Sequence, residues 1–187
     1  KRNAGSPRLL VGYDTRFASE HFASQVANVL SASGVGALVC SRSVPTPAVS
    51  FSVRHRKLDG AVNITASHNP GEYNGIKLVG KQAIPLSGDA GISDIRDMLL
   101  SDAVPAPGAL RGGYSETRVF DDYVEHVLSF IDLSTLRPFS LVLDAGSGIG
   151  GLVAPALFDR LPCRTRRLCF EVDGSFPNHE ANPLIEE

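Results

Sequence analysis

The sequence has no strong charge of either sign and no long apolar run. Its 18 basic and 20 acidic residues give a net charge of −2 over 187 residues, so no broad positive field marks a nucleic-acid-binding protein. No apolar stretch approaches the roughly 18 residues that a membrane-spanning helix needs, and no signal-peptide stretch follows the basic first residues. We therefore expect a cytoplasmic protein that has neither nucleic acid nor membrane among its partners and holds any anionic ligand locally.

Cysteine, histidine and methionine are scarce. The three cysteines cannot all pair with one another and lack the CxxC spacing of a zinc or redox site, so we expect reduced thiols. Four of the histidines likewise lack a paired spacing that suggests a metal: His21, His55, His126 and His179. The only methionine is Met98 and the first residue is Lys1, so we expect the chain to be part of a longer protein.

The first 65 residues alternate short apolar runs with amphipathic segments. This alternation predicts an α/β fold with a mixed, mainly parallel sheet covered by helices. Ser19 is positioned to cap the first helix, which ends near Gly34, and Pro47 is suited to open the second. The predicted strands cover residues 8–13, 35–39 and 60–65, and the helices cover residues 19–34 and 48–57.

The pattern changes after residue 65, because the turn-rich segment 66–75 is too short for a crossover helix. The strand at 76–79 is therefore expected to return antiparallel to its predecessor. A domain boundary is placed near 133–139, which gives a first domain at 1–135 and an incomplete second domain at 136–187. Other predicted elements are helices at 93–100, 120–131 and 152–161, strands at 141–144 and 166–172, and a breaker-rich loop at 105–113.

The first candidate site lies in the segment between these two antiparallel strands. Ser67 falls at the carboxyl end of a parallel strand, where ligands of open α/β sheets gather, and the returning strand brings Lys77 to the same end. A serine can accept and return a phosphoryl group, while His68 and Lys77 can neutralise its charge and move protons. The alternative is a plain turn in which Ser67 and Asn69 bond the backbone and Pro70 shapes the loop.

The second candidate site is a glycine-rich turn. Gly146, Gly148 and Gly151 form a GxGxxG pattern between a predicted strand and helix, and Glu171 follows twenty residues later. This is the layout of a dinucleotide-binding protein, in which backbone amides approach a pyrophosphate and the acid holds a ribose. The alternative is a tight structural turn, which the short stretch of chain after it favours.

Arg16 is a third, weaker candidate. It follows the first strand together with Asp14 and can contact a phosphate, although an ion pair between the two side chains would equally fix the turn between strand and helix.

Several motifs together resemble the α-D-phosphohexomutases, the phosphoglucomutase and phosphomannomutase type of enzyme. The central one is the hexapeptide TASHNP at 65–70, which is similar to the active-site serine motif of that family. The others follow the family's order and approximate spacing, and the resemblance covers nearly the whole chain. They are VGYDTR at 11–16, PTP at 45–47, YNGIK at 73–77, LDAGSG at 143–148, EVDGSFPNH at 171–179 and NPL at 182–184.

The resemblance implies a four-domain enzyme that interconverts hexose 1-phosphate and hexose 6-phosphate through a bisphosphorylated sugar. It assigns Ser67 as the phosphoryl carrier and as a magnesium ligand through its phosphate. His68 and Asn69 would line the site and bind substrate, and Lys77 would donate or accept a proton. Mg²⁺ and glucose 1,6-bisphosphate, or a similar hexose bisphosphate, are the implied cofactor and activator, with a hexose phosphate and the remaining domains as partners.

The chain also departs from the family pattern. It lacks the first strand, most of the first helix and the amino-terminal arginine motif of domain 1, and the aspartate-rich magnesium loop is expected just beyond Glu187. We therefore expect this chain alone to be inactive. A dinucleotide-binding protein and a noncatalytic phosphosugar-binding module stay open as alternatives.

Overall fold

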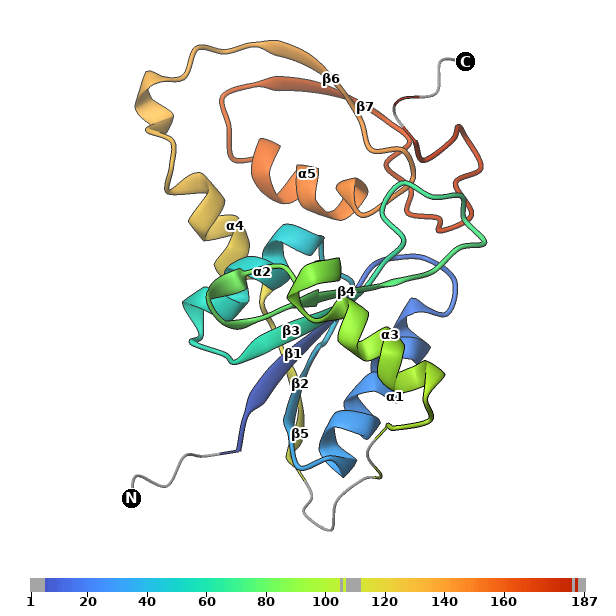
Figure 1. Ribbon diagram of the computed structural model, residues 1–187. Helices are drawn as coiled ribbons and strands as arrows, with labels where there is room; N and C mark the ends of the chain where they lie inside the picture. The colour runs from blue at the N-terminus through green and yellow to red at the C-terminus, as the bar shows by residue number, and fades with distance from the viewer. Residues whose placement is uncertain (1–5, 105, 107–111, 183, 185–187) are drawn as a thin grey trace.

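The computed structural model describes residues 6–104, 106, 112–182 and 184, and its larger part is built on a five-stranded sheet (Figure 1). The strand order is β4-β3-β1-β2-β5, and β4 alone runs antiparallel to its neighbour. This confirms the predicted mainly parallel α/β fold and the antiparallel return after residue 75. The strands are β1 (Arg8–Tyr13), β2 (Gly36–Cys40), β3 (Gly60–Ile64), β4 (Ile76–Val79) and β5 (Tyr114–Thr117).

Helices cover both faces of this sheet. The order β3-β1-β2 with two right-handed crossovers places α1 (Ser19–Ala32) and α2 (Thr46–His55) on opposite faces, and α4 (Phe120–Leu128) packs beside α2. Small side chains on α1 and α2 allow close approach to β1, the central strand, whose Leu10 and Val11 are fully buried. Within the described residues, no helix combines the length and apolar character needed to cross a membrane.

One local expectation was wrong, and one strand was missed. Ser19 does not cap α1, because its hydroxyl donates to Asp14 Oδ1 at 2.8 Å and the preceding Ala18 adopts a left-handed conformation at φ 59°. Strand β5 was not predicted, since its exposed, polar residues show no apolar run. The loop predicted at 105–113 falls largely outside the described residues.

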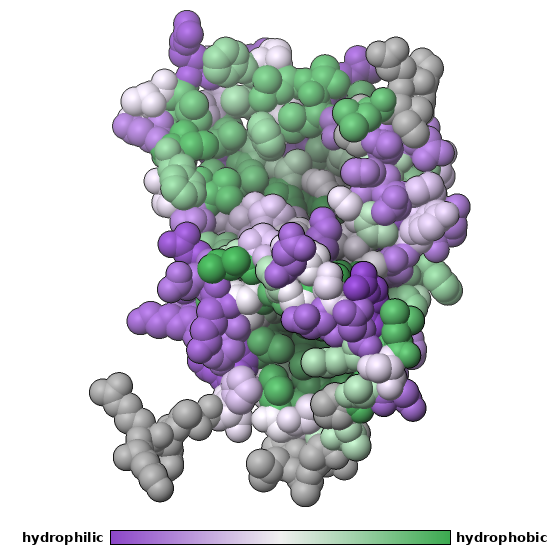
Figure 2. Space-filling model, in the orientation of Figure 1, coloured by the Kyte–Doolittle hydropathy of each residue, from purple (hydrophilic) through white to green (hydrophobic). Residues whose placement is uncertain are grey.

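A second, smaller unit follows α4. It contains the parallel strands β6 (Ser140–Asp144) and β7 (Arg164–Leu168) with α5 (Gly150–Phe158) between them, so the helix begins two residues earlier than predicted and the last strand ends four residues earlier. The predicted boundary at 133–139 falls in the connection between α4 and β6. Figure 2 shows apolar side chains gathered on the surface of this upper part. The exposed apolar residues of this unit include Phe139 and Val142.

Candidate functional site

The loop between β3 and β4 presents Ser67 at the carboxyl end of the parallel strands. Its base is closed by a hydrogen bond from Thr65 N to Gly75 O at 2.9 Å, and the Thr65 hydroxyl accepts from Ser67 N at 3.1 Å. Ser67 is exposed and adopts a left-handed backbone at φ 61°, a conformation that costs free energy for a residue other than glycine. The loop therefore presents Ser67 at the surface in a strained backbone conformation.

Arg16 explains how this loop keeps its shape. Its guanidinium is almost fully buried and pairs with Asp14 through Nε at 3.3 Å. The other two nitrogens donate to four carbonyl oxygens of the loop, at distances between 2.6 and 3.3 Å, so its N–H groups are already engaged and a substrate phosphate would have to displace them. The acceptors belong to Ser67, Asn69, Pro70 and Tyr73.

The substrate-contacting roles of Arg16 and Asn69 stay predictions, and in this structure both side chains bond the serine loop. The Asn69 amide donates to Ala66 O at 2.9 Å, within its own loop, and Asn69 does not line the neighbouring cavity. Both side chains stabilise the loop that presents the serine. The Asn69 hydrogen bond agrees with the plain-turn alternative, and the ion pair between Arg16 and Asp14 is present.

A cavity of about 430 Å³ opens beside the loop, and four of the five predicted site residues line it, Arg16 among them. Ser67, His68 and Lys77 all line it, although ten positions separate the first from the last. Lys77 reaches it from β4, where it is paired opposite Asn63 of β3. The far wall comes from the second unit and includes Phe176, His179 and the turn at 145–150.

The segment after β7 packs directly on the serine loop. The Phe176 ring lies 4.9 Å from the guanidinium carbon of Arg16. A Cβ on Gly174 would lie 2.4 Å from Thr15 O, so only glycine fits this close approach. In Figure 1 the red segment after β7 runs beside the green loop that joins β3 to β4. Residues about 100 positions apart therefore shape one site.

Three amides of the glycine-rich turn are already bonded within the protein. Gly146 N donates to Asp144 Oδ1 at 2.8 Å, Ser147 N donates to Cys169 O at 2.7 Å, and Gly148 N donates to Ala145 O at 3.0 Å. A pyrophosphate needs such amides free. The dinucleotide-binding alternative therefore fails on this geometry.

The same turn is shaped by close packing instead. A Cβ on Gly151 would lie 2.4 Å from Phe170 O, and Gly146 has φ 54°. The fully buried Ser147 hydroxyl accepts from Asn178 Nδ2 at 2.7 Å. Glu171, the acid that a ribose would need, is exposed beyond the end of β7.

Three ionisable side chains meet where β6 and β7 end. His179 Nε2 lies 3.3 Å from Asp144 Oδ1, and the Cys169 thiol is adjacent to the same carboxylate. The Gly146 N–H, followed by His179, holds the pKa of Asp144 below its usual value. Partial burial and the Asp144 carboxylate raise the pKa of the Cys169 thiol. Sequence reasoning missed this cluster, because its members lie 25 and 10 residues apart.

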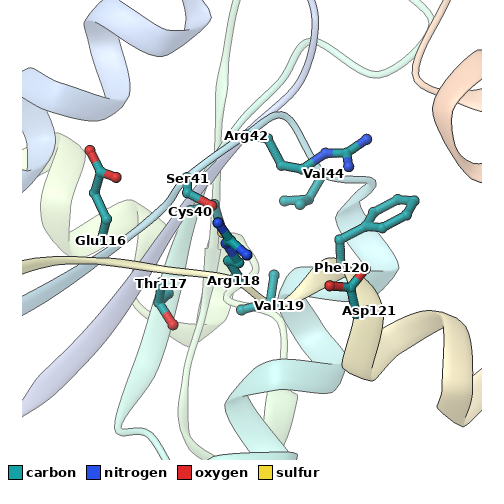
Figure 3. Close-up of a pocket in the computed structure, with 10 residues that line it drawn as sticks. All are labelled: Cys40, Ser41, Arg42, Val44, Glu116, Thr117, Arg118, Val119, Phe120 and Asp121. Atoms are coloured by element: carbon teal, nitrogen blue, oxygen red, sulfur yellow. The ribbon is translucent and has the colours of Figure 1, made fainter.

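A second and larger cavity, of about 570 Å³, lies where β2 and β5 end (Figure 3). Its walls mix charges of both signs, from Arg42 and Arg118 to Glu116 and Asp121. The Arg42 guanidinium carbon lies 4.4 Å from the centre of the Phe120 ring. This mixed lining does not select an anion, and the serine, histidine and lysine of the first candidate site lie elsewhere.

The fold and site together define an α/β protein whose polar pocket lies at the carboxyl ends of its parallel strands, between two structural units. Residues 1–103 match the family described as phosphoglucomutase/phosphomannomutase, alpha/beta/alpha domain I, and residues 121–187 match the corresponding domain II. The chain belongs to the phosphoglucomutase/phosphomannomutase family.

Individual relatives agree with this assignment. The chain is 40% identical over 182 residues to a protein named phosphohexose mutases from Xanthomonas campestris (strain B100) and 35% identical over 185 residues to a phosphomannomutase from Escherichia coli (strain K12). Each alignment covers 96% of this chain and 40% of the relative. A crystal structure of a family protein from Burkholderia thailandensis superposes with a TM-score of 0.81 at 33% identity, over 96% of this chain and 39% of that one. The chain thus spans about two fifths of the length of these relatives.

Proposed function

We propose that the whole protein is a phosphohexomutase that interconverts hexose 1-phosphate and hexose 6-phosphate. The observation that carries this proposal is the pocket in which an exposed serine on a clamped loop shares its walls with a histidine and a lysine. The names of the relatives, phosphohexose mutases and phosphomannomutase, support the same substrate class. Residues 1–135 would form the first domain and residues 136–187 the opening of the second, in a cytoplasmic enzyme.

Ser67 would transfer the phosphoryl group. The bond between its oxygen and phosphorus breaks as a sugar hydroxyl oxygen bonds to phosphorus, and the hydroxyl proton passes to a base. The resulting hexose bisphosphate turns over in the pocket and returns its other phosphate to Ser67. Exposure of the serine and rigidity of its loop support this role, because phosphoryl transfer depends mainly on positioning and on electrostatic stabilisation.

His68 and Lys77 would neutralise the charge of the phosphate and transfer protons. A phosphoserine adds roughly −1.5 to −2 charges, which need donors nearby. The Lys77 ammonium reaches the cavity from a strand rather than from a mobile loop, so it can neutralise phosphate at a fixed position. His68 follows Ser67 in the chain and lines the same pocket, where its imidazole can act as a proton donor or acceptor.

Magnesium would supply further charge stabilisation when it is bound. The one carboxylate among the described residues of the pocket wall is Asp14, and it is already bonded to Arg16 and Ser19. The described residues thus provide Ser67, through its phosphate, and no free acid, so they do not form a magnesium site by themselves. We propose that the remaining ligands and the hexose bisphosphate activator meet Ser67 in the whole enzyme, and that this chain alone is inactive.

The direct test is covalent phosphate on Ser67 in the full-length protein. After incubation with glucose 1,6-bisphosphate and Mg²⁺, peptide mass spectrometry should find one phosphate on the peptide that contains Ser67. A coupled assay should then detect conversion of glucose 1-phosphate to glucose 6-phosphate, and Ser67→Ala should abolish both signals.

Ser41→Ala is the matched control, because Ser41 is also exposed but lines the other cavity. It should keep both the phosphate and the turnover. Turnover without phosphate on Ser67 would overturn the mechanism, and the absence of both signals would favour a noncatalytic binding module. If the 187-residue chain, purified free of the expression host's own mutase, converted glucose 1-phosphate, its expected inactivity would be contradicted.

A further inference from the structure

We propose that Asp144, Cys169 and His179 form a binding site for a zinc-class divalent cation, separate from the magnesium chemistry of the proposed reaction. One ligand atom from each residue lies within 4.8 Å of the other two. In a tetrahedral zinc site neighbouring ligand atoms are about 3.5 Å apart, so small rotations of the side chains would complete the geometry.

The fold fixes all three positions. Asp144 is the last residue of β6, Cys169 directly follows β7, and the parallel pairing of the strands places these ends side by side. His179 returns over them from the segment that packs on the serine loop. The backbone of Cys169 is left-handed at φ 51°, and its carbonyl accepts from Ser147 N at 2.7 Å. The site therefore combines two strand ends with one tethered loop.

The hydrogen bonds of His179 also indicate a positive charge at this site. His179 Nδ1 lies 2.9 Å from Glu180 O, and a carbonyl can only accept, so Nδ1 carries the proton. In the neutral ring Nε2 is then an acceptor, yet it faces the Asp144 carboxylate oxygen, another acceptor, at 3.3 Å. A positive charge between the two satisfies both atoms, and that charge is either a second proton on the ring or a metal ion.

Metal-bound histidines commonly show the arrangement seen at Nδ1. Their other ring nitrogen donates to a backbone carbonyl or a carboxylate, which fixes the ring and makes the ligand nitrogen more basic. Asp144 is similarly oriented by the N–H of Gly146. Both ligands therefore have the outer hydrogen bonds that a metal site requires.

The donor set selects the class of ion. A thiolate, an imidazole and a carboxylate suit zinc and similar borderline-soft metals, whereas magnesium prefers oxygen ligands alone. Three protein ligands leave the fourth tetrahedral position to water or to another ligand. Binding would release the Cys169 thiol proton to solvent as the sulfur–metal bond forms.

The absence of a metal-binding spacing in the sequence does not argue against this site. The spacing patterns of zinc proteins describe ligands on one short loop or helix, while these three residues come from separate elements. An ion here would hold the His179 ring at the wall of the cavity that contains Ser67. It would also fasten the segment after β7 to the second sheet.

The test is titration of the purified, metal-free and reduced chain with Zn²⁺ against a coloured chelator. We expect one equivalent to bind, with a rise in Tm. Co²⁺ as a probe should show the absorption of a cobalt–thiolate bond. Cys169→Ser and His179→Gln should each weaken binding by at least about tenfold, since loss of an outer-shell partner alone weakens metal affinity by about 10–100-fold.

Cys163→Ser is the matched control, because Cys163 is also partly buried near β7 but is not part of the cluster. It should bind zinc as the unaltered chain does. The proposal is overturned if the unaltered chain does not bind one equivalent of zinc, or if bound cobalt shows no thiolate absorption. It is also overturned if Cys169→Ser and Cys163→Ser lose the same amount of zinc affinity. None of these readouts depends on mutase activity.

Discussion

The two units of the chain bury their apolar residues very differently. In the described part of the chain, every fully buried apolar side chain lies between Leu10 and Leu128, around the five-stranded sheet. In the second unit α5 is apolar on all sides but has no fully buried residue, and Val142 of β6 remains 64% exposed. The described residues therefore give the first unit a core of its own and leave the apolar side chains of the second only partly covered.

The contrast matters because the candidate site lies between the two units. Its serine loop is anchored in the well-packed unit through Arg16, while the opposite wall comes from the weakly packed unit. We therefore expect substitutions in the first unit to change global stability and substitutions at the contact to change mainly the site.

The largest effect is expected for Leu10→Ala in the central strand. Removal of this fully buried side chain should lower the free energy of unfolding by about 2–5 kcal/mol, from lost burial and the cavity left behind. The matched change Val142→Ala should alter it by no more than about 0.5 kcal/mol, because that side chain is largely exposed. Urea unfolding measures the change in unfolding free energy for both variants. Equal losses would contradict the difference in packing between the two units.

Arg16→Lys should act on both stability and the site. Lysine keeps the charge but cannot reach four carbonyls with a planar fork, so we expect a loss of about 2–3 kcal/mol in unfolding free energy. Amide hydrogen exchange in residues 66–75 should accelerate, and phosphorylation of Ser67 in the full-length protein should slow. Arg42→Lys is the control, since Arg42 is an exposed residue of the other cavity. Unchanged exchange in the Arg16 variant would refute the clamp.

Gly174→Ala tests the contact between the units. The added methyl would collide with Thr15 O, and the resulting displacement should cost about 1–2 kcal/mol. Hydrogen exchange should rise in the serine loop and in the segment after β7, and not in α1. Gly113→Ala adds the same methyl where nothing lies within 4 Å and should leave exchange unchanged. Similar behaviour of both variants would contradict a tight contact.

The smallest effect is expected for the ion pair between Glu125 of α4 and Arg160, just after α5. Arg160 lowers the pKa of Glu125 from its ordinary 4.5, so the pair stabilises the folded state above that pH and the contribution is lost as pH falls through the lowered pKa. In Arg160→Gln, an NMR titration should show the Glu125 pKa returning toward 4.5. Both side chains are exposed, so stability should hardly change. A pKa unaffected by the substitution would show that the pair does not form in solution.

Much of the fold could be predicted from apolar periodicity. The buried strands and amphipathic helices of the first unit have clear patterns of apolar residues. The loop at 66–75 is too short for a crossover helix, so β4 had to return antiparallel. Strand β5 could not be found in this way, because its four residues are mostly exposed at the sheet edge and pair with β2 more than 70 positions earlier. The capping role of Ser19 failed because Asp14, five residues away, competes for its hydroxyl.

The candidate site could likewise be predicted from the sequence only in part. Residue types and strand direction were enough to expect Ser67 and Lys77 at one cleft, and the structure has both on its walls. The role of Arg16 could not be predicted, because its acceptors are backbone carbonyls more than 50 positions away, which no side-chain pattern records. The contact with Phe176 depends on how the two units pack, and that arrangement is not visible in local sequence.

The Arg16 clamp also sets the direction of the peptide dipoles in the serine loop. The described chain contains no cis peptide bond, so each N–H points opposite to the carbonyl of the residue before it. With the Ser67 and Tyr73 carbonyls turned toward the guanidinium, the amides of His68 and Asn74 must turn away from it. A buried cation thereby orients the positive ends of these dipoles outward, so its influence can reach an anion on the serine without direct contact.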